Sequence, residues 1–187
     1  ATIKLQRANE EIIRQKIKNE ISSLMDTWNS ILESVDNMFD VITNYSVQRL
    51  TSLQSEQDLG IVNLSEQMEL LELDPAYIDF YILKDGLCIN STSPADTGVN
   101  FYSSGEDQKD FMLQMQEQGR SVVQQWTMEN DTKRFKCYGF QATEDKKYVV
   151  VVGCYSETAD ELTDMFKQRM NRIVRENNKI LSVNLYL

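Results

Sequence analysis

Apolar and aromatic residues recur early in the chain at alternating steps of four and three residues. They stand at nine successive positions: Ile17, Ile21, Leu24, Trp28, Ile31, Val35, Met38, Ile42 and Tyr45. This 3.5-residue spacing is typical of a helix face that packs along another helix. Since no Gly or Pro precedes Gly60, the pattern predicts one helix through about residue 55. At 1.5 Å per residue it would be roughly 80 Å long, so part of it must project or pair with a second copy.

The spacing of the apolar residues then changes twice along the chain. The stretch IVNLSEQMELLELDP predicts a short helix with Ser65 as its cap. Period-two alternation then predicts two strands around the turn Lys84-Asp85-Gly86, and a helix follows over 107–118. Three further strands are predicted in SVVQQWTM, RFKCYGFQA and KKYVVVVGCY, and a last helix from Ser156 to about residue 178. For the tail KILSVNLYL, a helical continuation and a strand both stay open.

These elements predict an α+β fold: a long N-terminal helix packed on a PAS-like, five-stranded antiparallel sheet, with a C-terminal exit helix. The expected parts are a signalling helix over 1–59, a sensor module over 60–155, and a C-terminal helix over 156–187 that leads to a membrane span.

The composition narrows the classes of function. The chain has 187 residues, with 19 basic and 29 acidic residues and no histidine. A net charge of −10 repels nucleic acid and anionic lipid at long range, and the lack of His argues against His-based catalysis and His-ligated metal. We find no nucleophile with a base, no phosphate-binding glycine loop and no metal cluster in the sequence. We therefore expect no enzyme activity, no cofactor and no metal. No apolar run approaches the roughly 20 residues that cross a bilayer, and no signal peptide is evident.

One stretch resembles a known family. The segment YIDFYILKDGLCINSTSPADTGVNF, followed after a helix by SVVQQW, RFKCYGFQATEDKKYVVVVGCYS and another helix, resembles the Cache sensor domains of bacterial and archaeal transmembrane receptors. The resemblance implies an extracytoplasmic domain, extracellular or periplasmic, with a membrane span at each end. It implies a ligand-sensing input to a chemotaxis-signalling, histidine-kinase or diguanylate-cyclase output. Both ends of the chain look cut from something longer, which agrees with this expectation.

A candidate ligand site follows from strand alternation and from the resemblance. Alternation over 134–141 puts Arg134, Lys136, Tyr138 and Phe140 on one face, and Phe135, Cys137 and Gly139 on the other. The second face is small and apolar, and we expect it to pack closely on the long helix, with Gly139 allowing near approach. A cation among aromatic rings suits a small anionic or amphoteric ligand. In the Cache family, the ligand commonly lies between this face and the loop after the second strand. The candidate ligand-binding residues are therefore Asn90, Thr92, Ser93, Tyr102, Trp126, Lys136, Tyr138 and Tyr155.

Other readings of these residues stay open. Arg134 and Lys136 could form a solvated edge, and core packing would explain Trp126 and the tyrosines equally well. Asn90 and Ser93 stand where carboxylate-sensing members typically place Arg and His, so recognition of the citrate type is not expected. The pattern of the amino-acid-binding branch is incomplete. The ligand could be an amino acid, a small organic acid, or neutral.

The pairing register of the last hairpin decides which face carries Tyr155 and whether Cys137 lies opposite Cys154. If the last hairpin pairs residues whose numbers sum to an odd value, Tyr155 shares the face of Lys136, whereas a one-residue slip reverses this. A turn at Asp145-Lys146 would set Cys137 opposite Cys154, where buried free thiols are favoured over a disulfide. The acidic stretches over 66–74 and 129–131 are interpreted as solvated surface.

The early helix face predicts a partner. We expect a homodimer through five residues of its seam: Ile17, Ile21, Leu24, Trp28 and Ile31. The same seam could instead pack against the C-terminal helix of its own chain. The alternative function is a dimerisation or protein-docking module that binds no small molecule.

Overall fold

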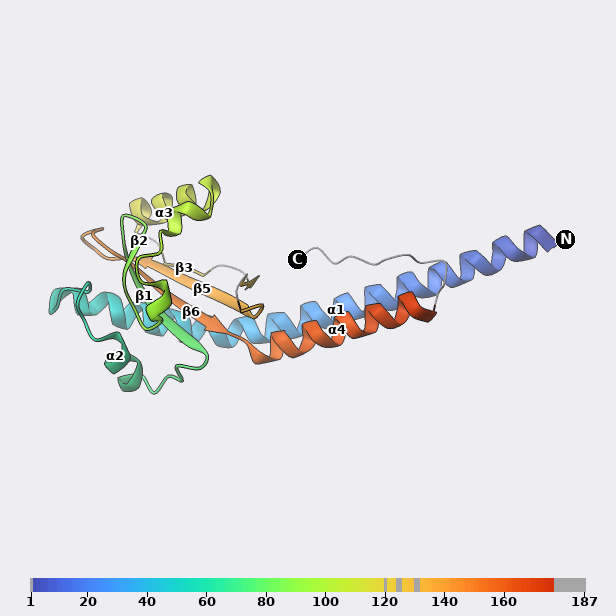
Figure 1. Ribbon diagram of the computed structural model, residues 1–187, viewed down its shortest axis with the longest axis horizontal. Coiled ribbons are helices and arrows are strands. Elements are labelled where there is room, and N and C mark those ends of the chain that lie inside the picture. Colours follow the sequence, from blue (N-terminus) through green and yellow to red (C-terminus); the bar gives the residue numbers. More distant parts are fainter. Residues whose placement is uncertain (1, 120, 124–125, 130–131, 177–187) are drawn as a thin grey trace. The chain divides into compact units, whose positions relative to one another are not determined.

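The computed structural model describes residues 2–119, 121–123, 126–129 and 132–176 (Figure 1). The chain divides into two compact units. The helical unit consists of Ala1–Asp36 and Glu157–Leu187, and the sheet unit consists of Asn37–Ser156. Helix α1 (Thr2–Ser52) runs through both units and is followed by a short 3-10 helix, Leu53–Ser55. The prediction of one helix through about residue 55 is confirmed, and the tail 179–187 lies outside the described residues.

Two antiparallel helices form the helical unit. Helix α4 (Glu157–Glu176) lies alongside the N-terminal part of α1 (Figure 1). Its buried Phe166, Met170 and Ile173 form a cluster against which three of the predicted seam residues pack, namely Ile17, Ile21 and Leu24. The rings of Trp28 and Phe166 meet edge to face at 6.2 Å. These four residues thus pack as the alternative arrangement requires, Ile31 is half-buried, and homodimerisation through the seam stays a prediction.

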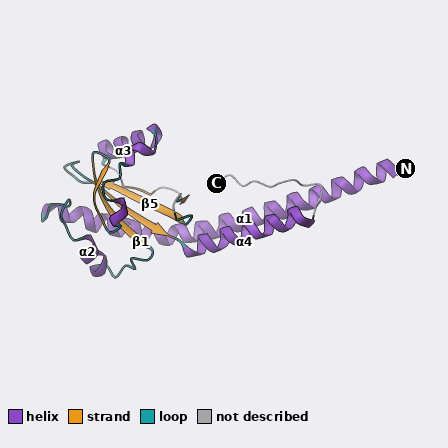
Figure 2. Ribbon diagram, viewed as in Figure 1, coloured by secondary structure: helices purple, strands orange, loops and turns teal. Residues whose placement is uncertain are grey.

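An antiparallel six-stranded sheet forms the centre of the sheet unit (Figure 2). Its strands are β1 (Ile78–Lys84), β2 (Leu87–Ser91), β3 (Ser121–Val123), β4 (Thr127–Met128), β5 (Phe135–Ala142) and β6 (Val149–Tyr155). The order is β2-β1-β6-β5-β3, with β4 also pairing to β5. The α+β class is confirmed. Over the third expected strand, the structure describes two segments, β3 and β4, so the described residues contain six strands rather than five. Strand β6 is central and buried, as its run of valines predicts.

The C-terminal part of α1 covers one face of the sheet. A methyl group at Gly139 would lie 1.8 Å from Cγ2 of Thr43, so strand and helix touch where glycine removes the side chain. Thr43 also reaches the thiol of Cys154, at 3.6 Å between Oγ1 and Sγ. This confirms the expectation that the small face of β5 packs on the long helix.

The opposite face is covered by α3 (Glu106–Gln118) and by the 3-10 segment Phe101–Ser104. Met112 and Met115 of α3 are buried there in a cluster with side chains from β1, β5 and β6. Tyr102 stacks over Gly86, where a Cβ atom would lie 2.5 Å from its ring. This covered face also carries the candidate site.

Local residues determine the turn between β1 and β2 and the start of the second helix. Asp85 and Gly86 both have positive φ, 50° and 78°, which is the backbone of the tight turn predicted between β1 and β2. The short helix α2 (Leu64–Leu70) is capped by Asn63, whose side chain accepts from the Glu66 amide at 3.2 Å. The prediction of Ser65 as the cap was wrong, because the helix begins one residue before it.

Candidate functional site

Lys136 is the centre of a polar cluster on the covered face. It lies on β5, and its side chain is 1% exposed. Its ammonium donates to Asp79 Oδ2 at 2.8 Å, to the Tyr81 hydroxyl at 2.7 Å and to the Tyr155 hydroxyl at 3.1 Å. Three donors thus meet three acceptors, which is what a buried ammonium group requires.

Three tyrosine rings enclose this ammonium. Nζ of Lys136 lies 4.3 Å from the ring centre of Tyr155, 5.2 Å from that of Tyr81 and 5.3 Å from that of Tyr138. These distances are within the range of cation–π attraction. Gly153 on β6 makes the space, because a Cβ atom there would lie 2.5 Å from Cε of Lys136.

Two carboxylates balance the charge of Lys136. Asp79 accepts from the Tyr81 hydroxyl at 3.2 Å, and Glu129 accepts from the Tyr155 hydroxyl at 2.9 Å. Glu129 Oε1 is also 3.5 Å from the ammonium. The Asp79 and Glu129 side chains are 16% and 25% exposed. The carboxylates therefore form the side of the cluster that solvent reaches.

A second cation lies at the edge of the cluster. The guanidinium carbon of Arg134 is 4.2 Å from the ring centre of Tyr155. With Arg134 included, the described residues of the cluster comprise two cations and two carboxylates, whose formal charges sum to zero.

Burial and hydrogen bonding shift the pKa values in the cluster. Burial alone lowers the pKa of Lys136, but its interactions with Tyr81 and Tyr138 and its hydrogen bond to Asp79 outweigh that effect and raise it. Burial raises the pKa of Tyr138 to about 12 and also raises the pKa of Tyr81. Burial raises the pKa of Glu129, but hydrogen bonds from Thr132 and Tyr155 and the charge of Lys136 lower it overall. At neutral pH, Lys136 and Glu129 are therefore charged and the two tyrosines are neutral.

The structure brings together three of the eight predicted ligand-binding residues. Lys136 pairs with Tyr155 and Tyr138 with Gly153, so the pair sums are odd and the three side chains share one face. Tyr102 lies on the same face, in the apolar part beside Tyr138. The register that would gather these residues is confirmed.

Two predicted residues lie on the opposite face. Asn90 pairs with Ile82, and its amide donates to the carbonyls of Leu59 and Val62 at 3.1 and 2.8 Å. The ring of Trp126 meets Phe39 of α1 at 4.9 Å. Asn90 therefore holds the chain that follows α1, and Trp126 packs on α1 itself. Strand alternation directs Asn90 away from Lys136, and Trp126 lies between β3 and β4. The prediction that these two residues bind a ligand stays a prediction.

Thr92 and Ser93 take part in local hydrogen bonds that involve backbone amides. The Thr92 hydroxyl accepts from the Phe80 amide at 2.9 Å, and the Ser93 amide donates to the Ser91 hydroxyl at 2.9 Å. Both hold the segment that leaves β2, and neither has a hydrogen bond to Lys136 among those of the described residues.

The sequence analysis missed the two acids. Glu129 was interpreted as solvated surface, yet it accepts from Tyr155 and lies beside Lys136. Asp79 is the single acidic residue of the largely apolar strand IDFYILK. A lone acid in a buried strand requires a partner, and this signal could have identified it. The expectation for the cysteines is confirmed. Cys137 lies opposite Cys154 in the register of β5 and β6, and both are buried free thiols.

An apolar region adjoins the charged cluster on the same face. The ring of Tyr81 meets Phe101 edge to face at 5.9 Å, and Phe111 of α3 meets Phe140 at 5.6 Å. Tyr138 contacts both regions, because its ring lies 6.2 Å from that of Phe140 as well as near Lys136. The face therefore changes from charged to apolar across Tyr138.

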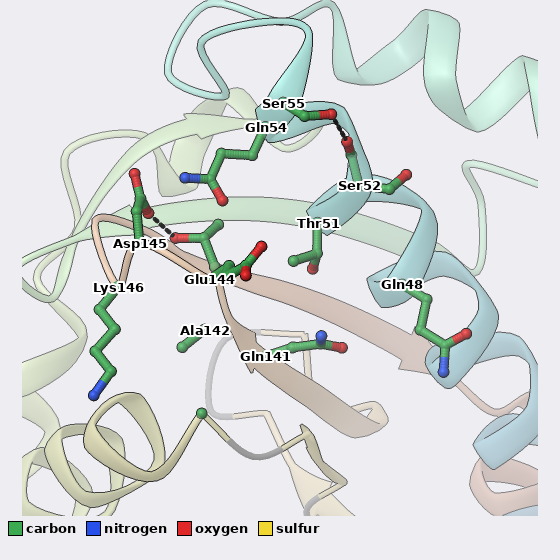
Figure 3. Close-up of a pocket in the computed structure, with 12 residues that line it drawn as sticks. Gln48, Thr51, Ser52, Gln54, Ser55, Gln141, Ala142, Glu144, Asp145 and Lys146 are labelled. Atoms are coloured by element: carbon green, nitrogen blue, oxygen red, sulfur yellow. Dashed lines mark hydrogen bonds between the residues drawn. The ribbon is translucent and has the colours of Figure 1, made fainter.

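A separate groove lies between the end of α1 and the turn that joins β5 to β6 (Figure 3). Its volume is about 880 Å³, and its lining is mostly polar, including Gln48, Gln54, Gln141 and Asp145. Oε1 of Gln141 is buried without a hydrogen-bond partner among the described residues. The groove was not predicted from the sequence, and it offers amides and hydroxyls rather than a buried charge.

Within the described parts of the chain, no group of three or more His, Cys, Asp or Glu side chains is placed to hold a metal ion. Of the described helices, none is long and apolar enough to cross a bilayer.

No family model matches the chain, and no curated protein matches it. Solved structures do show similarity. The ligand-binding domain of the Campylobacter jejuni chemoreceptor Tlp3 in complex with L-valine is 13% identical, with a TM-score of 0.47 over 78% of this chain. The Tlp3 sensory domain with isoleucine bound is 10% identical, with a TM-score of 0.46 over 80% of this chain.

A third similar structure is the Bacillus subtilis YkuI protein, which has an EAL domain and is in complex with c-di-GMP and calcium. It is 11% identical, with a TM-score of 0.48 over 76% of this chain. This chain spans 63% of each Tlp3 chain and 38% of the YkuI chain. With TM-scores below 0.5, these similarities do not extend to the ligand or the activity of this chain.

Proposed function

We propose that this chain is an extracytoplasmic, noncatalytic sensing domain of a transmembrane receptor, and that its ligand is a small zwitterion such as an α-amino acid. The observation that carries the proposal is the buried, charge-balanced cluster around Lys136. Membrane spans at both ends, and an output such as chemotaxis signalling, a histidine kinase or a diguanylate cyclase, are part of the proposal.

Stability alone does not account for this cluster. Burying an ammonium group with two carboxylates costs desolvation energy, and well-packed apolar residues of similar volume often stabilise a fold equally well. Perturbed titratable groups gathered on one face are instead typical of functional sites. The acids that flank Lys136 remain partly exposed, so a solute can approach them.

A zwitterion fits the charges of the cluster. Its carboxylate would accept from the Lys136 ammonium, and its ammonium group would donate to Asp79 and Glu129. The exchange keeps the formal charge of the site at zero, whereas an anion or a cation alone would leave one protein charge unmatched. An apolar ligand side chain would extend past Tyr138 toward Tyr102, where the face becomes apolar.

Strand β5 connects this site to helix α1 within the sheet unit. Lys136 lies on one face of β5, and Gly139 contacts Thr43 of α1 on the other. A ligand that draws Lys136 from its present acceptors would move β5 against α1. Signalling then requires that the ligand bind one arrangement of strand and helix more tightly than the other.

The test is a screen of amino acids, small carboxylates and small amines by thermal shift, followed by calorimetry on hits. We expect a zwitterionic hit whose affinity falls at least about tenfold in Asp79→Asn and in Glu129→Gln, since each removes a carboxylate to which the ammonium group of the ligand would donate. Gln48→Ala in the separate groove is the matched control and should leave the affinity unchanged. If Gln48→Ala weakens binding and the cluster variants do not, the groove is the site and the assignment to Lys136 is wrong.

One observation favours the alternative, a docking or dimerisation module without a small ligand. All three hydrogens of the Lys136 ammonium already have acceptors within the chain. A screen in which no class of compound raises the melting temperature, together with self-association in sedimentation, would support that alternative against the sensor.

A further inference from the structure

Charge is segregated along the helical unit. Residues 19–35 and 157–166 contain seven acidic residues and no Lys or Arg. Residues 6–18 and 167–176 contain eight basic residues and three acidic ones. The basic residues are Arg7, Arg14, Lys16, Lys18, Lys167, Arg169, Arg172 and Arg175. The two halves therefore differ in sign, with formal charges of −7 and +5.

Antiparallel pairing places the basic halves of both helices together. Phe166 contacts Trp28, while Ile173, further along α4, packs in the cluster that includes Ile17. Glu20 marks the boundary between the halves, and it pairs with Arg169 at 2.8 Å. Beyond this boundary, the charged residues of both helices are mainly Lys and Arg. On α4, Lys167 also lies near Asp164, and Arg172 lies near Glu20 and Glu176, at 3.6–3.9 Å.

Exposed aliphatic side chains lie within the basic half. Ile12 and Ile13 are 66% and 50% exposed. Arg14 and Lys16, which follow them on α1, are also exposed. A helix that exposes both aliphatic and basic side chains is typical of binding at the interface of an anionic bilayer.

We propose that the basic half of the helical unit, residues 6–18 with 167–176, binds the surface of a bilayer that contains anionic phospholipids. Its Lys and Arg side chains pair with lipid phosphates, and Ile12 and Ile13 enter the headgroup region. The two isoleucines favour a bilayer over another polyanion, because a polyanion without acyl chains offers them no apolar environment.

The net charge of −10 repels an anionic bilayer at long range, but it does not prevent binding at short range. The basic segment of α1 spans 13 residues, or about 20 Å at 1.5 Å per residue. Screening reduces the field of exposed charges within about 8 Å at physiological ionic strength. A bilayer at the basic end therefore interacts with the local positive charge rather than with the acidic remainder of the chain.

The test measures co-sedimentation of the chain with vesicles of phosphatidylglycerol and phosphatidylcholine in equal parts, and with phosphatidylcholine alone. We expect binding to the anionic vesicles, weakening with added salt. Each basic residue near an anionic surface strengthens binding by roughly fivefold. The variant Arg14→Gln/Lys16→Gln/Lys18→Gln should therefore bind about 100-fold more weakly. Glutamine keeps the helix propensity, and circular dichroism checks the fold.

The matched control, Lys84→Gln/Lys109→Gln/Lys133→Gln, makes the same change of net charge in the sheet unit and should bind as the parent does. Equal binding to both vesicle types, or an equal loss in the control, would overturn the proposal. So would a loss of self-association, without vesicles, in the first variant, because a second copy would then be the partner. None of these results depends on a ligand of the sheet unit, so this proposal and the proposed function fail independently.

Discussion

Replacing Lys136 with methionine tests whether the buried ammonium holds the sheet cluster together. Methionine keeps the length and most of the apolar stem of lysine but removes the charge. Asp79 and Glu129, which now lie 2.8 and 3.5 Å from Nζ, would lose the cation that they share. The Tyr81 and Tyr155 hydroxyls would still donate to these carboxylates. The cost therefore arises mainly from unmatched charge, with a smaller part from the three hydrogen bonds that the ammonium donates.

The size of the stability loss in Lys136→Met follows from how deeply the ion pair is buried. Removing one partner of a buried ion pair costs about 3–5 kcal/mol. The carboxylates of Asp79 and Glu129 are 16% and 25% exposed, so water offsets part of this cost. We expect the free energy of unfolding to fall by about 3 kcal/mol, which is a large part of the 5–15 kcal/mol typical of a folded protein.

The assay is urea unfolding at neutral pH, followed by circular dichroism. The double variant Lys136→Met/Asp79→Asn should recover at least half of the loss, because it removes one of the two unmatched charges. Lys133→Met, at an exposed position nearby, is the control and should change the stability by less than about 0.5 kcal/mol. A loss below about 1 kcal/mol for Lys136→Met, or a further loss on adding Asp79→Asn, would refute this account of the cluster.

Three further outcomes are expected. Gly139→Ala should destabilise the sheet unit by roughly 2–3 kcal/mol, because its methyl group would lie 1.8 Å from Thr43 Cγ2; adding Thr43→Ser should recover part of this in urea unfolding, and no recovery would contradict the contact. Burial raises the pKa of Tyr138 from 10.0 to about 12, so the unfolded chain loses this proton first. Stability should therefore hold below pH 10 and fall above it, by up to about 1.4 kcal/mol per pH unit, with a shallower fall in Tyr138→Phe; equal slopes would contradict this. Burial raises the pKa of the Cys88 thiol to about 11. Alkylation of Cys88 at pH 8, located by peptide mass analysis, should therefore be on the order of 100-fold slower in the native chain than in urea. Equal rates would show that the thiol is accessible.

Periodicity predicted most of the secondary structure. The long helix, the tight turn at Asp85 and Gly86, the central valine strand and the contact of Gly139 with the long helix all follow from local patterns. The separate pairing of β3 and β4 does not follow, because SVVQQWTM is predicted as one strand, whereas β3 and β4 pair with β5 in registers that differ by one residue.

The candidate site was predicted in part. Lys136 and Tyr138 are two residues apart on one strand, so alternation alone places them on one face. Tyr155 required the register of the last hairpin, which the sequence left open. That Asn90 and Trp126 lie away from Lys136 could not be predicted, because a family pattern says which segment approaches a site but not which way each side chain of that segment points. Glu129 was missed because an acidic residue near a turn looks solvated until its partner is known.

By itself, the sequence determined the periodic elements, the charge segregation between the two halves of the helical unit and the absence of histidine, because each depends on residue type and spacing along the chain. The tertiary structure alone decided that Lys136 meets Asp79, Glu129 and three tyrosines, and that the helix seam packs on α4. The physical reason is that strand pairing and burial bring together residues that are far apart in the chain. Glu129, which appears solvated from the sequence, lies beside Lys136 once the strands pair, and this contact helps to lower its pKa.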